Sequence, residues 1–437
     1  MRPHLASLIE DFRRHGHQIA VVTHRGNRRF PTTWQGLAEL SARFANELAQ
    51  LDTCVGDRVL IWGTNSAEWV AAFFGCVLRG VIAVPLDAAG SADFARRVAA
   101  EVQPKLVVGD PEQLDRLGSV AAPPRLDFSA FASTLPPPEY APVAELSRET
   151  VLQIIFTSGT TAEPKGIVHT HGNVLASLDP VEEEIGKYLH YERLVHPLRF
   201  LHTLPLSHVF GQFIGLWVPP LIAAEVHYES RLEASRLIRT IREERVSVLA
   251  AVPRVLELLR AQVTAEFPEL PKMPAESARQ PIAKRWWRFR KLHSRFGYKF
   301  WAFLCGGASL SSDLENFWTT AGFALIQGYG MTETTALVTL NHPFKSTRGS
   351  IGRPLRGREV EIGAGGEILV RGASIADRLW QNGRMEPRGE EWLATGDLVT
   401  RDEQGELVFA GRKSDVIVTS AGLNIHPQDL EAVLRRQ

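Results

Sequence analysis

The sequence predicts an α/β protein with a large core of two layered α/β halves, followed by a small β-barrel or β-sheet subdomain. Three observations support this prediction. Short apolar runs alternate with segments of helical periodicity between residues 37 and 109, which is typical of a doubly wound sheet. The same alternation returns between residues 201 and 327. After Arg348, short β-type runs are separated by glycine-rich turns.

The first half begins with a helix at Leu37–Leu51, where apolar residues recur at helical spacing. The elements predicted next are a strand at Val59–Trp62, a helix at Ala67–Leu78, a strand at Val81–Pro85, a helix at Ala92–Val102 and a strand at Leu106–Gly109. A proline-rich connector at Leu135–Pro142 leads to a largely apolar strand at Val151–Phe156.

The second half contains four short apolar runs that we interpret as strands: Leu201–Leu206, Val246–Ala251, Phe300–Cys305 and Ala324–Gln327. Helical segments at Ser235–Glu244 and Val255–Glu266 separate them. The β-type runs of the last part are Val360–Ile362, Glu367–Arg371 and Leu407–Ala410.

Composition indicates a globular protein of 437 residues with 44% hydrophobic and 22% charged residues, enough for more than one domain or subdomain. Lysine plus arginine (49) equal aspartate plus glutamate (49), so no overall charge attracts nucleic acid. The three cysteines lie far apart in apolar contexts, which is typical of reduced core residues in a cytoplasmic protein. The charged start and the absence of a long apolar run predict neither an export signal nor a membrane-spanning helix.

A candidate phosphate-binding loop, TSGTTAEPKG at residues 157–166, follows the strand at Val151–Phe156. It offers hydroxyl groups, a flexible glycine and a cation with little side-chain bulk, as a polyphosphate requires. The residues concerned are Thr157, Ser158, Gly159, Thr160, Thr161 and Lys165. The loop lacks the glycine before the lysine and the serine or threonine after it that the P-loop of NTPases needs. The alternative interpretation is a surface turn rich in Ser, Thr and Gly.

Three further stretches suit a nucleotide. Gly306, Gly307 and Ala308 follow a predicted strand and leave room for a flat base. The stretch QGYGMTE comprises Gln327, Gly328, Tyr329, Gly330, Met331, Thr332 and Glu333. It offers a ring for stacking, a hydroxyl for a phosphate and a carboxylate for magnesium. Asp397, after a glycine, suits the two ribose hydroxyls, with Arg412 as a second contact. Taken singly, each stretch is also compatible with a structural turn.

The ordered set TSGTTAEPKG, LPLSHVFG, GGA, GYGMTE, ATGD and GRKSD resembles the adenylate-forming superfamily of acyl-CoA synthetases, adenylation domains and luciferases. This resemblance implies that ATP activates a carboxylate to an acyl-adenylate with release of pyrophosphate, and that a thiol, such as that of CoA, then accepts the acyl group. It further implies that the loop at 157–166, with Lys165, surrounds the β- and γ-phosphates, that Thr332 contacts the α-phosphate and that Glu333 binds Mg²⁺. Catalysis then depends on positioning and charge stabilisation.

The LPLSHVFG stretch resembles the version found in fatty-acyl ligases, which implies a medium- or long-chain fatty acid as substrate. His208, Val209, Phe210 and Gly211 are the expected acyl-binding residues, with His208 also at the carboxylate end or acting as a gate. Neighbouring apolar residues, from Phe213 to Trp217, either line an alkyl tunnel or belong to the core, and His208 itself is alternatively a structural histidine. A ligase that loads a carrier-protein phosphopantetheine and a non-catalytic nucleotide-binding domain remain the functional alternatives.

The resemblance divides the chain into an AMP-binding core at 1–411, with a β-rich subdomain at 340–411, and a hinge with the start of a small C-terminal domain at 412–437. Ser414 stands where the family typically has a hinge Asp or Lys. Most of the small domain, including its catalytic lysine, is expected to be missing, which predicts impaired turnover for this chain.

A basic, aromatic stretch at 279–299 carries eight positive charges and contains Trp286, Trp287 and Phe289. We interpret it as an amphipathic helix. Its two alternatives are a solvated helix whose aromatic residues pack on the second half, and a face that contacts an anionic membrane surface or ligand.

Overall fold

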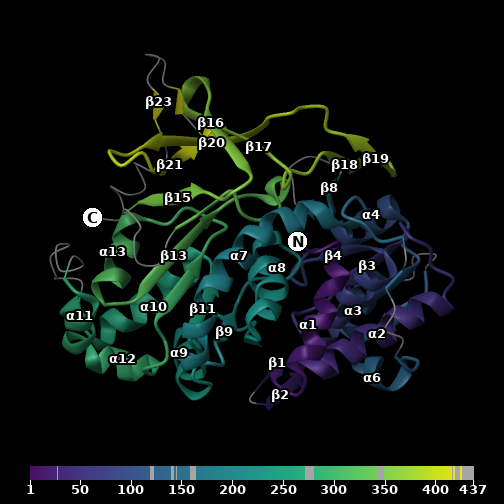
Figure 1. Cartoon of the computed structure of the whole chain (residues 1–437), viewed down its shortest axis with the longest axis horizontal. Coiled ribbons are helices and arrows are strands. Elements are labelled where there is room, and N and C mark those ends of the chain that lie inside the picture. The colour runs from purple at the N-terminus through teal and green to yellow at the C-terminus, as the bar shows by residue number, and fades with distance from the viewer. Residues whose placement is uncertain are drawn as a thin grey trace.

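The computed structural model describes residues 1–26, 28–118, 123–138, 142–143, 145–157, 164–270, 280–341, 349–415, 417–418 and 424–425. Two large sheets organise this part of the chain (Figure 1). The helices are α1 (Leu8–His15), α2 (Trp34–Gln50), α3 (Ala67–Arg79), α4 (Ala92–Val102), α5 (Pro111–Leu117), α6 (Phe131–Thr134), α7 (His171–Val195), α8 (Val209–Gln212), α9 (Ala234–Glu243), α10 (Pro253–Glu266), α11 (Ile282–Arg288), α12 (Arg290–Phe296) and α13 (Ser312–Thr320).

The first half is built on an eight-stranded sheet in the order β19-β18-β8-β7-β4-β3-β5-β6. Its strands are β3 (Arg58–Trp62), β4 (Ile82–Leu86), β5 (Leu106–Gly109), β6 (Arg125–Asp127), β7 (Val151–Thr157), β8 (Lys165–Thr170), β18 (Arg378–Gln381) and β19 (Arg384–Pro387). Pairing is parallel along β7-β4-β3-β5-β6 and antiparallel along β19-β18-β8-β7. The predicted α/β alternation of this half is confirmed.

The second half and the β-rich segment share a thirteen-stranded sheet in the order β16-β17-β20-β21-β15-β14-β13-β12-β11-β9-β10-β1-β2. Its strands are β1 (Ile19–Arg25), β2 (Arg28–Thr33), β9 (Arg199–His202), β10 (Glu225–Tyr228), β11 (Val248–Ala251), β12 (Ala302–Cys305), β13 (Ala324–Tyr329), β14 (Thr339–Leu340), β15 (Ser350–Pro354), β16 (Arg358–Ile362), β17 (Glu367–Gly372), β20 (Leu393–Arg401) and β21 (Leu407–Arg412). The run from β13 to β1 is parallel. A separate ladder joins β22 (Ile417–Val418) to β23 (Asn424–Ile425).

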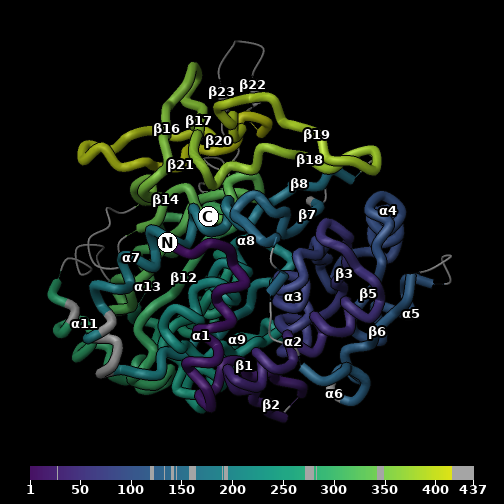
Figure 2. The backbone as a smooth tube through the Cα atoms, turned by 45° about the vertical axis from the view of Figure 1, so that its right-hand side comes forward, coloured from purple at the N-terminus to yellow at the C-terminus, as the bar shows by residue number. Residues whose placement is uncertain are grey.

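The β-rich segment lies across one end of both halves, as the two views in Figures 1 and 2 show. Strand β15 continues the second sheet through β14, whereas β18 pairs with β8 of the first sheet. Strands β15 and β16, at opposite ends of the run β16-β17-β20-β21-β15, also approach each other. The run therefore curls toward a barrel, but none of the described strand pairings closes it. Because it contacts both halves, this segment can bring residues of both into one site.

Helix α3 joins the cores of the two halves. The side chain of Ser66 accepts a hydrogen bond from the Trp69 amide at its start, and Gly80 ends it in the left-handed conformation. Phe73 packs edge-on against Trp217 of the second half, with ring centroids 5.6 Å apart. Trp217 is 2% exposed, so its ring is part of the core rather than of an open tunnel.

The basic stretch differs from the single helix predicted for 279–299. It forms α11 and α12, which are separated at Phe289, where the backbone leaves helical geometry (φ −100°, ψ 27°). Phe289 is buried in the second core, and Trp286 donates a hydrogen bond to the carbonyl of Gly322. Trp287 is 74% exposed. Contacts with the second half therefore account for Phe289 and Trp286, but not for the exposed Trp287.

Candidate functional site

A pocket of about 420 Å³ lies where the second half meets the β-rich segment. Its lining includes eight of the residues predicted to bind nucleotide: Gly307, Ala308, Gln327, Gly328, Tyr329, Gly330, Asp397 and Arg412. Ser309, Ile351, Phe409 and Asp415 complete it. Three stretches that are up to about a hundred residues apart in sequence thus surround one cavity.

The parallel pairing of β12 with β13 explains half of this arrangement. Both strands end at the same edge of the sheet, so the residues after Cys305 lie beside Gly328 and Tyr329. A Cβ atom on Gly306 would lie 2.9 Å from the Phe210 ring and 3.1 Å from the Gly328 carbonyl oxygen. Gly307 has a φ of 79°, which favours glycine. Glycine at position 306 therefore has a local steric cause, whereas the role of these small residues in leaving room for a base stays a prediction.

The hairpin of β20 and β21 supplies the opposite wall, in a register that places Asp397 beside Arg412. The Tyr329 hydroxyl donates a hydrogen bond to Asp397 Oδ2 at 2.9 Å, and Arg412 Nε lies 3.1 Å from Oδ1. Asp397 is 4% exposed. Burial raises the pKa of its carboxyl group, while Tyr329 and Arg412 oppose that shift. The result is a fixed carboxylate facing a cavity.

A tight turn follows the pocket at Gly330. A Cβ atom at this position would lie 1.9 Å from the carbonyl oxygen of Ala336, so the turn accepts only glycine. Thr335 and Ala336 have positive φ values of 52° and 84°. The Thr335 hydroxyl donates to the Ser374 carbonyl at 2.6 Å, which helps to stabilise this unfavourable geometry. Two residues within this turn, Thr332 and Glu333, are half-buried in the short 3-10 helix Thr332–Thr334.

A buried histidine connects this turn to the candidate phosphate loop. His169 Nε2 lies 2.8 Å from the carbonyl oxygen of Thr332, so this nitrogen carries the proton and donates it. His169 Nδ1 accepts a hydrogen bond from Gln153, which also exchanges two hydrogen bonds with Gln212. Burial lowers the pKa of His169 to about 4, so the ring is neutral near pH 7. Sequence reasoning missed this polar cluster. Its sequence signals are Gln153 within the apolar run Val151–Phe156 and a histidine among the apolar residues after Lys165.

The hairpin of β7 and β8 carries the phosphate loop itself. Thr157 is the last residue of β7 and pairs with Lys165, the exposed first residue of β8. Ser158, Gly159, Thr160 and Thr161 lie outside the described residues. His169 is four residues after Lys165 on β8. Its hydrogen bond to the Thr332 carbonyl therefore connects the strand that follows the phosphate loop to the turn at Thr332.

The expected acyl-binding residues lie between this pocket and a second one. Phe210 packs against Gly306, which directly precedes Gly307 of the first pocket's lining. A Cβ atom on Gly211 would lie 2.1 Å from the Pro205 carbonyl oxygen, so helix α8 starts in close contact with the preceding turn. Val209 is buried. His208 is exposed, and its Nε2 lies 3.4 Å from Asp87 Oδ2, which holds the pKa of that carboxyl below its usual range.

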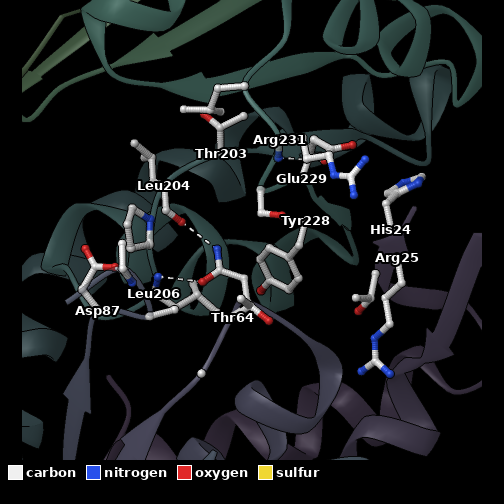
Figure 3. Close-up of a pocket in the computed structure, with 18 of the residues that line it drawn as sticks. His24, Arg25, Thr64, Asp87, Thr203, Leu204, Leu206, Tyr228, Glu229 and Arg231 are labelled. Atoms are coloured by element: carbon white, nitrogen blue, oxygen red, sulfur yellow. Dashed lines mark hydrogen bonds between the residues drawn. The ribbon is translucent and has the colours of Figure 1, made fainter. Parts of the chain in front are cut away.

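The second pocket, of about 590 Å³, was not predicted. Residues that follow β3, β4, β9 and β10 line it, so both sheets contribute (Figure 3). Asn65 donates to the Leu204 carbonyl at 2.7 Å and accepts from the Leu206 amide at 3.0 Å, which joins the two halves. Its charged lining residues are Arg25, Asp87, Glu229, Arg231 and Arg236.

Comparisons with known proteins concern the family and the fold of the chain. The profile of a family described as AMP-binding enzyme matches residues 8–380. The long-chain-fatty-acid–CoA ligase FadD15 of Mycobacterium bovis is 28% identical over 432 residues, covering 89% of this chain and 70% of that protein.

Two solved structures have the same fold. The N-terminal domain of FACL13 from Mycobacterium tuberculosis, bound to an inhibitor, aligns with a TM-score of 0.74 and 23% identity over 94% of this chain and all of that one. The o-succinylbenzoate CoA synthetase MenE of Bacillus subtilis, in complex with its acyl-adenylate intermediate, aligns with a TM-score of 0.75 and 24% identity, covering all of this chain and 83% of that one. Within the part of the chain that the structure describes, no helix is long and apolar enough to cross a membrane.

Proposed function

Because the chain belongs to the family of AMP-binding enzymes, we propose that it uses ATP to activate a carboxylic acid and transfers the acyl group to CoA. A carboxylate oxygen attacks the α-phosphorus of ATP, the bond to the β-phosphate breaks, and pyrophosphate leaves. The sulfur of CoA then attacks the acyl carbon and AMP leaves. The observation that best supports the proposal is the convergence of Tyr329, Asp397 and Arg412 with the glycine-rich edge at Gly307 around one cavity.

Each wall of the cavity suits one part of the nucleotide. Asp397 would accept hydrogen bonds from the ribose hydroxyls, because a carboxylate has about four acceptor positions and Tyr329 and Arg412 occupy two. The small residues after β12 would leave space for the adenine.

The phosphates would extend from this cavity toward the hairpin of β7 and β8. Thr332 would contact the α-phosphate, and Lys165 with the loop after Thr157 would surround the β- and γ-phosphates. The Glu333 carboxylate offers the hard oxygen that Mg²⁺ prefers, and the ion would reduce repulsion between the incoming carboxylate and the phosphate.

The acid itself is proposed to be a medium- or long-chain fatty acid, which would place the protein in fatty-acid metabolism. The relative FadD15 is named as a long-chain-fatty-acid–CoA ligase. Phe210 contacts Gly306 and comes within 3.7 Å of the position of a Cβ on Gly328, so the segment from His208 to Gly211 would lie beside the acyl group of an adenylate in this cavity. The apolar side chains of the segment from His208 to Gly211 would contact an alkyl chain, and exposed His208 would lie near the carboxylate end of the acid.

Pyrophosphate exchange tests this function. The protein is incubated with MgATP, labelled pyrophosphate and straight-chain acids of increasing length, with an acid-free reaction as the control. We expect exchange that depends on the acid and increases with chain length up to an optimum. Transfer to CoA or to a holo carrier protein, measured in parallel, distinguishes a CoA ligase from the alternative carrier-protein ligase. AMP binding without exchange for any acid would contradict the proposal and favour a non-catalytic nucleotide-binding domain.

A peripheral membrane contact is a second proposal, and exposed Trp287 favours it. Arg290 lies 5.2 Å from the centre of this ring, and further basic residues of α11 and α12 are exposed nearby. Such a cationic, aromatic surface suits anionic lipid. We propose a cytoplasmic enzyme that binds membranes reversibly. Sedimentation with anionic vesicles should decrease with added salt and in Trp287→Ala, and equal binding to neutral vesicles would contradict it.

A further inference from the structure

A cluster of two histidines and a glutamate lies at the far end of the second sheet from the β-rich segment. His24 is the second-last residue of β1, His227 lies on the neighbouring strand β10, and Glu244 is the C-cap residue of α9. In the register of β1 with β10, Val22 pairs with His227, so His24 is on the same face of the sheet as His227. Sequence alone gives no hint of it, because His24 and His227 are about two hundred residues apart.

The three side chains bring their ligand atoms together. His24 Nε2 lies 3.2 Å from His227 Nδ1, which lies 3.9 Å from Glu244 Oε2, and all three atoms lie within 4.8 Å of one another. Two ligands of a tetrahedral zinc ion, each about 2.0–2.1 Å from the metal, are about 3.4 Å apart. The two histidine nitrogens are thus already at the separation that one ion requires, and the Glu244 carboxylate would move closer to bind the same ion.

Charged groups surround His227. The opposite ring nitrogen, His227 Nε2, lies 3.0 Å from Glu225 Oε1, a charge contact without hydrogen-bond geometry. Arg199 donates to Glu225 Oε2 at 2.9 Å, and Arg29 donates to Oε1 at 3.2 Å. A carboxylate beside Nε2 favours the proton on that nitrogen and directs the lone pair of Nδ1 toward His24 and Glu244. A carboxylate is a common neighbour of the second ring nitrogen in histidine ligands of metals.

We propose that His24 Nε2, His227 Nδ1 and the Glu244 carboxylate bind one divalent transition-metal ion, with zinc as the best match. Two imidazoles and one carboxylate suit zinc, whereas magnesium and calcium prefer oxygen ligands. Three protein ligands leave a fourth position for water.

The surroundings of the cluster are compatible with this ion. His227 is fully buried, and the Glu244 side chain is 22% exposed. His24 also lines the 590 Å³ pocket, so one of the three ligands faces that cavity (Figure 3). Arg29 donates a hydrogen bond to Glu244 Oε2 at 3.2 Å. Either Oε1 or the remaining lone pair of Oε2 would bind the metal.

The ion would act as a cross-link rather than in acyl activation. It would join β1, β10 and the end of α9, and none of its three ligands is among the residues that line the 420 Å³ pocket. Binding to the native state alone raises its stability by mass action. The proposal is independent of the proposed enzymatic function, because it involves neither ATP nor an acid.

Zinc titration of the chelator-treated protein, without nucleotide, tests the site. Calorimetry should give one Zn²⁺ per chain, with affinity that falls as the pH is lowered and the histidines take up protons. Zinc should also raise the melting temperature. Substituting Co²⁺ should give the visible absorption of a four- or five-coordinate site.

Three variants make the test specific. His24→Ala and Glu244→Gln should each weaken zinc binding by at least about a hundredfold, since loss of an outer-shell partner alone costs up to that much. His17→Ala, which removes an exposed histidine close by in sequence, should bind zinc as the parent does. Circular dichroism checks the fold of each variant, and Glu244→Gln remains informative if His24→Ala fails to fold. No zinc binding by the parent, or equal affinity in the parent and Glu244→Gln, would overturn the proposal and leave only a hydrogen bond between the two imidazoles.

Discussion

Replacement of Asp397 by alanine is the sharpest test of the nucleotide pocket. In the structure, this buried carboxylate has two partners, the Tyr329 hydroxyl at 2.9 Å and Arg412 Nε at 3.1 Å. About two of its acceptor positions remain for ribose hydroxyls. Hydrogen bonds to a charged group contribute about 1.5–3 kcal/mol each, and water can partly replace the lost partner at the open side of the pocket. We therefore expect AMP binding to weaken by about 1–3 kcal/mol, or roughly 5- to 150-fold.

The fold should survive this change. Arg412 is 59% exposed, so water can solvate its guanidinium once Asp397 is gone. The Tyr329 hydroxyl loses its acceptor, a cost of about 1–3 kcal/mol for a buried group. Thermal melting should show a lower but still cooperative transition.

Isothermal titration with AMP measures the effect, and two variants serve as controls. Glu403→Ala removes an exposed carboxylate from the same hairpin and should leave the affinity unchanged. Tyr329→Phe removes only the hydroxyl that orients Asp397 and should have a smaller effect than Asp397→Ala. AMP affinity equal to that of the parent, in an Asp397→Ala protein that melts cooperatively, would refute the assignment of the ribose to this carboxylate.

Three further predictions concern the turn after the pocket and the buried histidines. Gly330→Ala should lower the free energy of unfolding by at least about 2 kcal/mol in urea titrations, because its Cβ would collide with the Ala336 carbonyl oxygen at 1.9 Å; an unchanged urea midpoint would show that the turn can relax. Glu333→Gln should reduce pyrophosphate exchange at least about tenfold and raise the Mg²⁺ concentration needed, with AMP affinity preserved; an unaltered Mg²⁺ dependence would assign the metal elsewhere. Burial lowers the pKa of His169 and of His202 to about 4. Below about pH 6.5 these histidines therefore take up protons in the unfolded chain but stay neutral in the native protein. Each should lower the free energy of unfolding by up to about 1.4 kcal/mol per pH unit as the pH falls from 6.5 toward 4. Urea unfolding at pH 7 and pH 5 measures this slope, and equal stability at the two values would contradict the buried neutral state.

The sequence was most informative where chemistry and local periodicity coincide. The predicted helix at Ala92–Val102 and strand at Leu106–Gly109 have the observed bounds, because their apolar patterns and their boundary residues agree. The candidate nucleotide stretches were recognisable because each is short, contiguous and unusual in composition. The α/β class and the family followed from these features and are confirmed.

Longer segments were less predictable where tertiary packing competes with local pattern. The basic stretch was predicted to be one amphipathic helix, yet it breaks at Phe289, whose ring is buried in the second core. The strand predicted at Leu201–Leu206 ends at His202, since the following residues turn to meet Asn65 of the first half. In both places a contact with a distant segment overrides local preference.

By itself, then, the sequence indicated the α/β class, many of its elements and the chemical groups that the proposed reaction needs. Only the tertiary structure decided which groups meet. His169 contacts Thr332, and His24 contacts His227, through pairings between residues more than 150 positions apart. Such contacts depend on strand order and register. These are set by burial summed over whole sheets, so no short stretch of sequence can specify them.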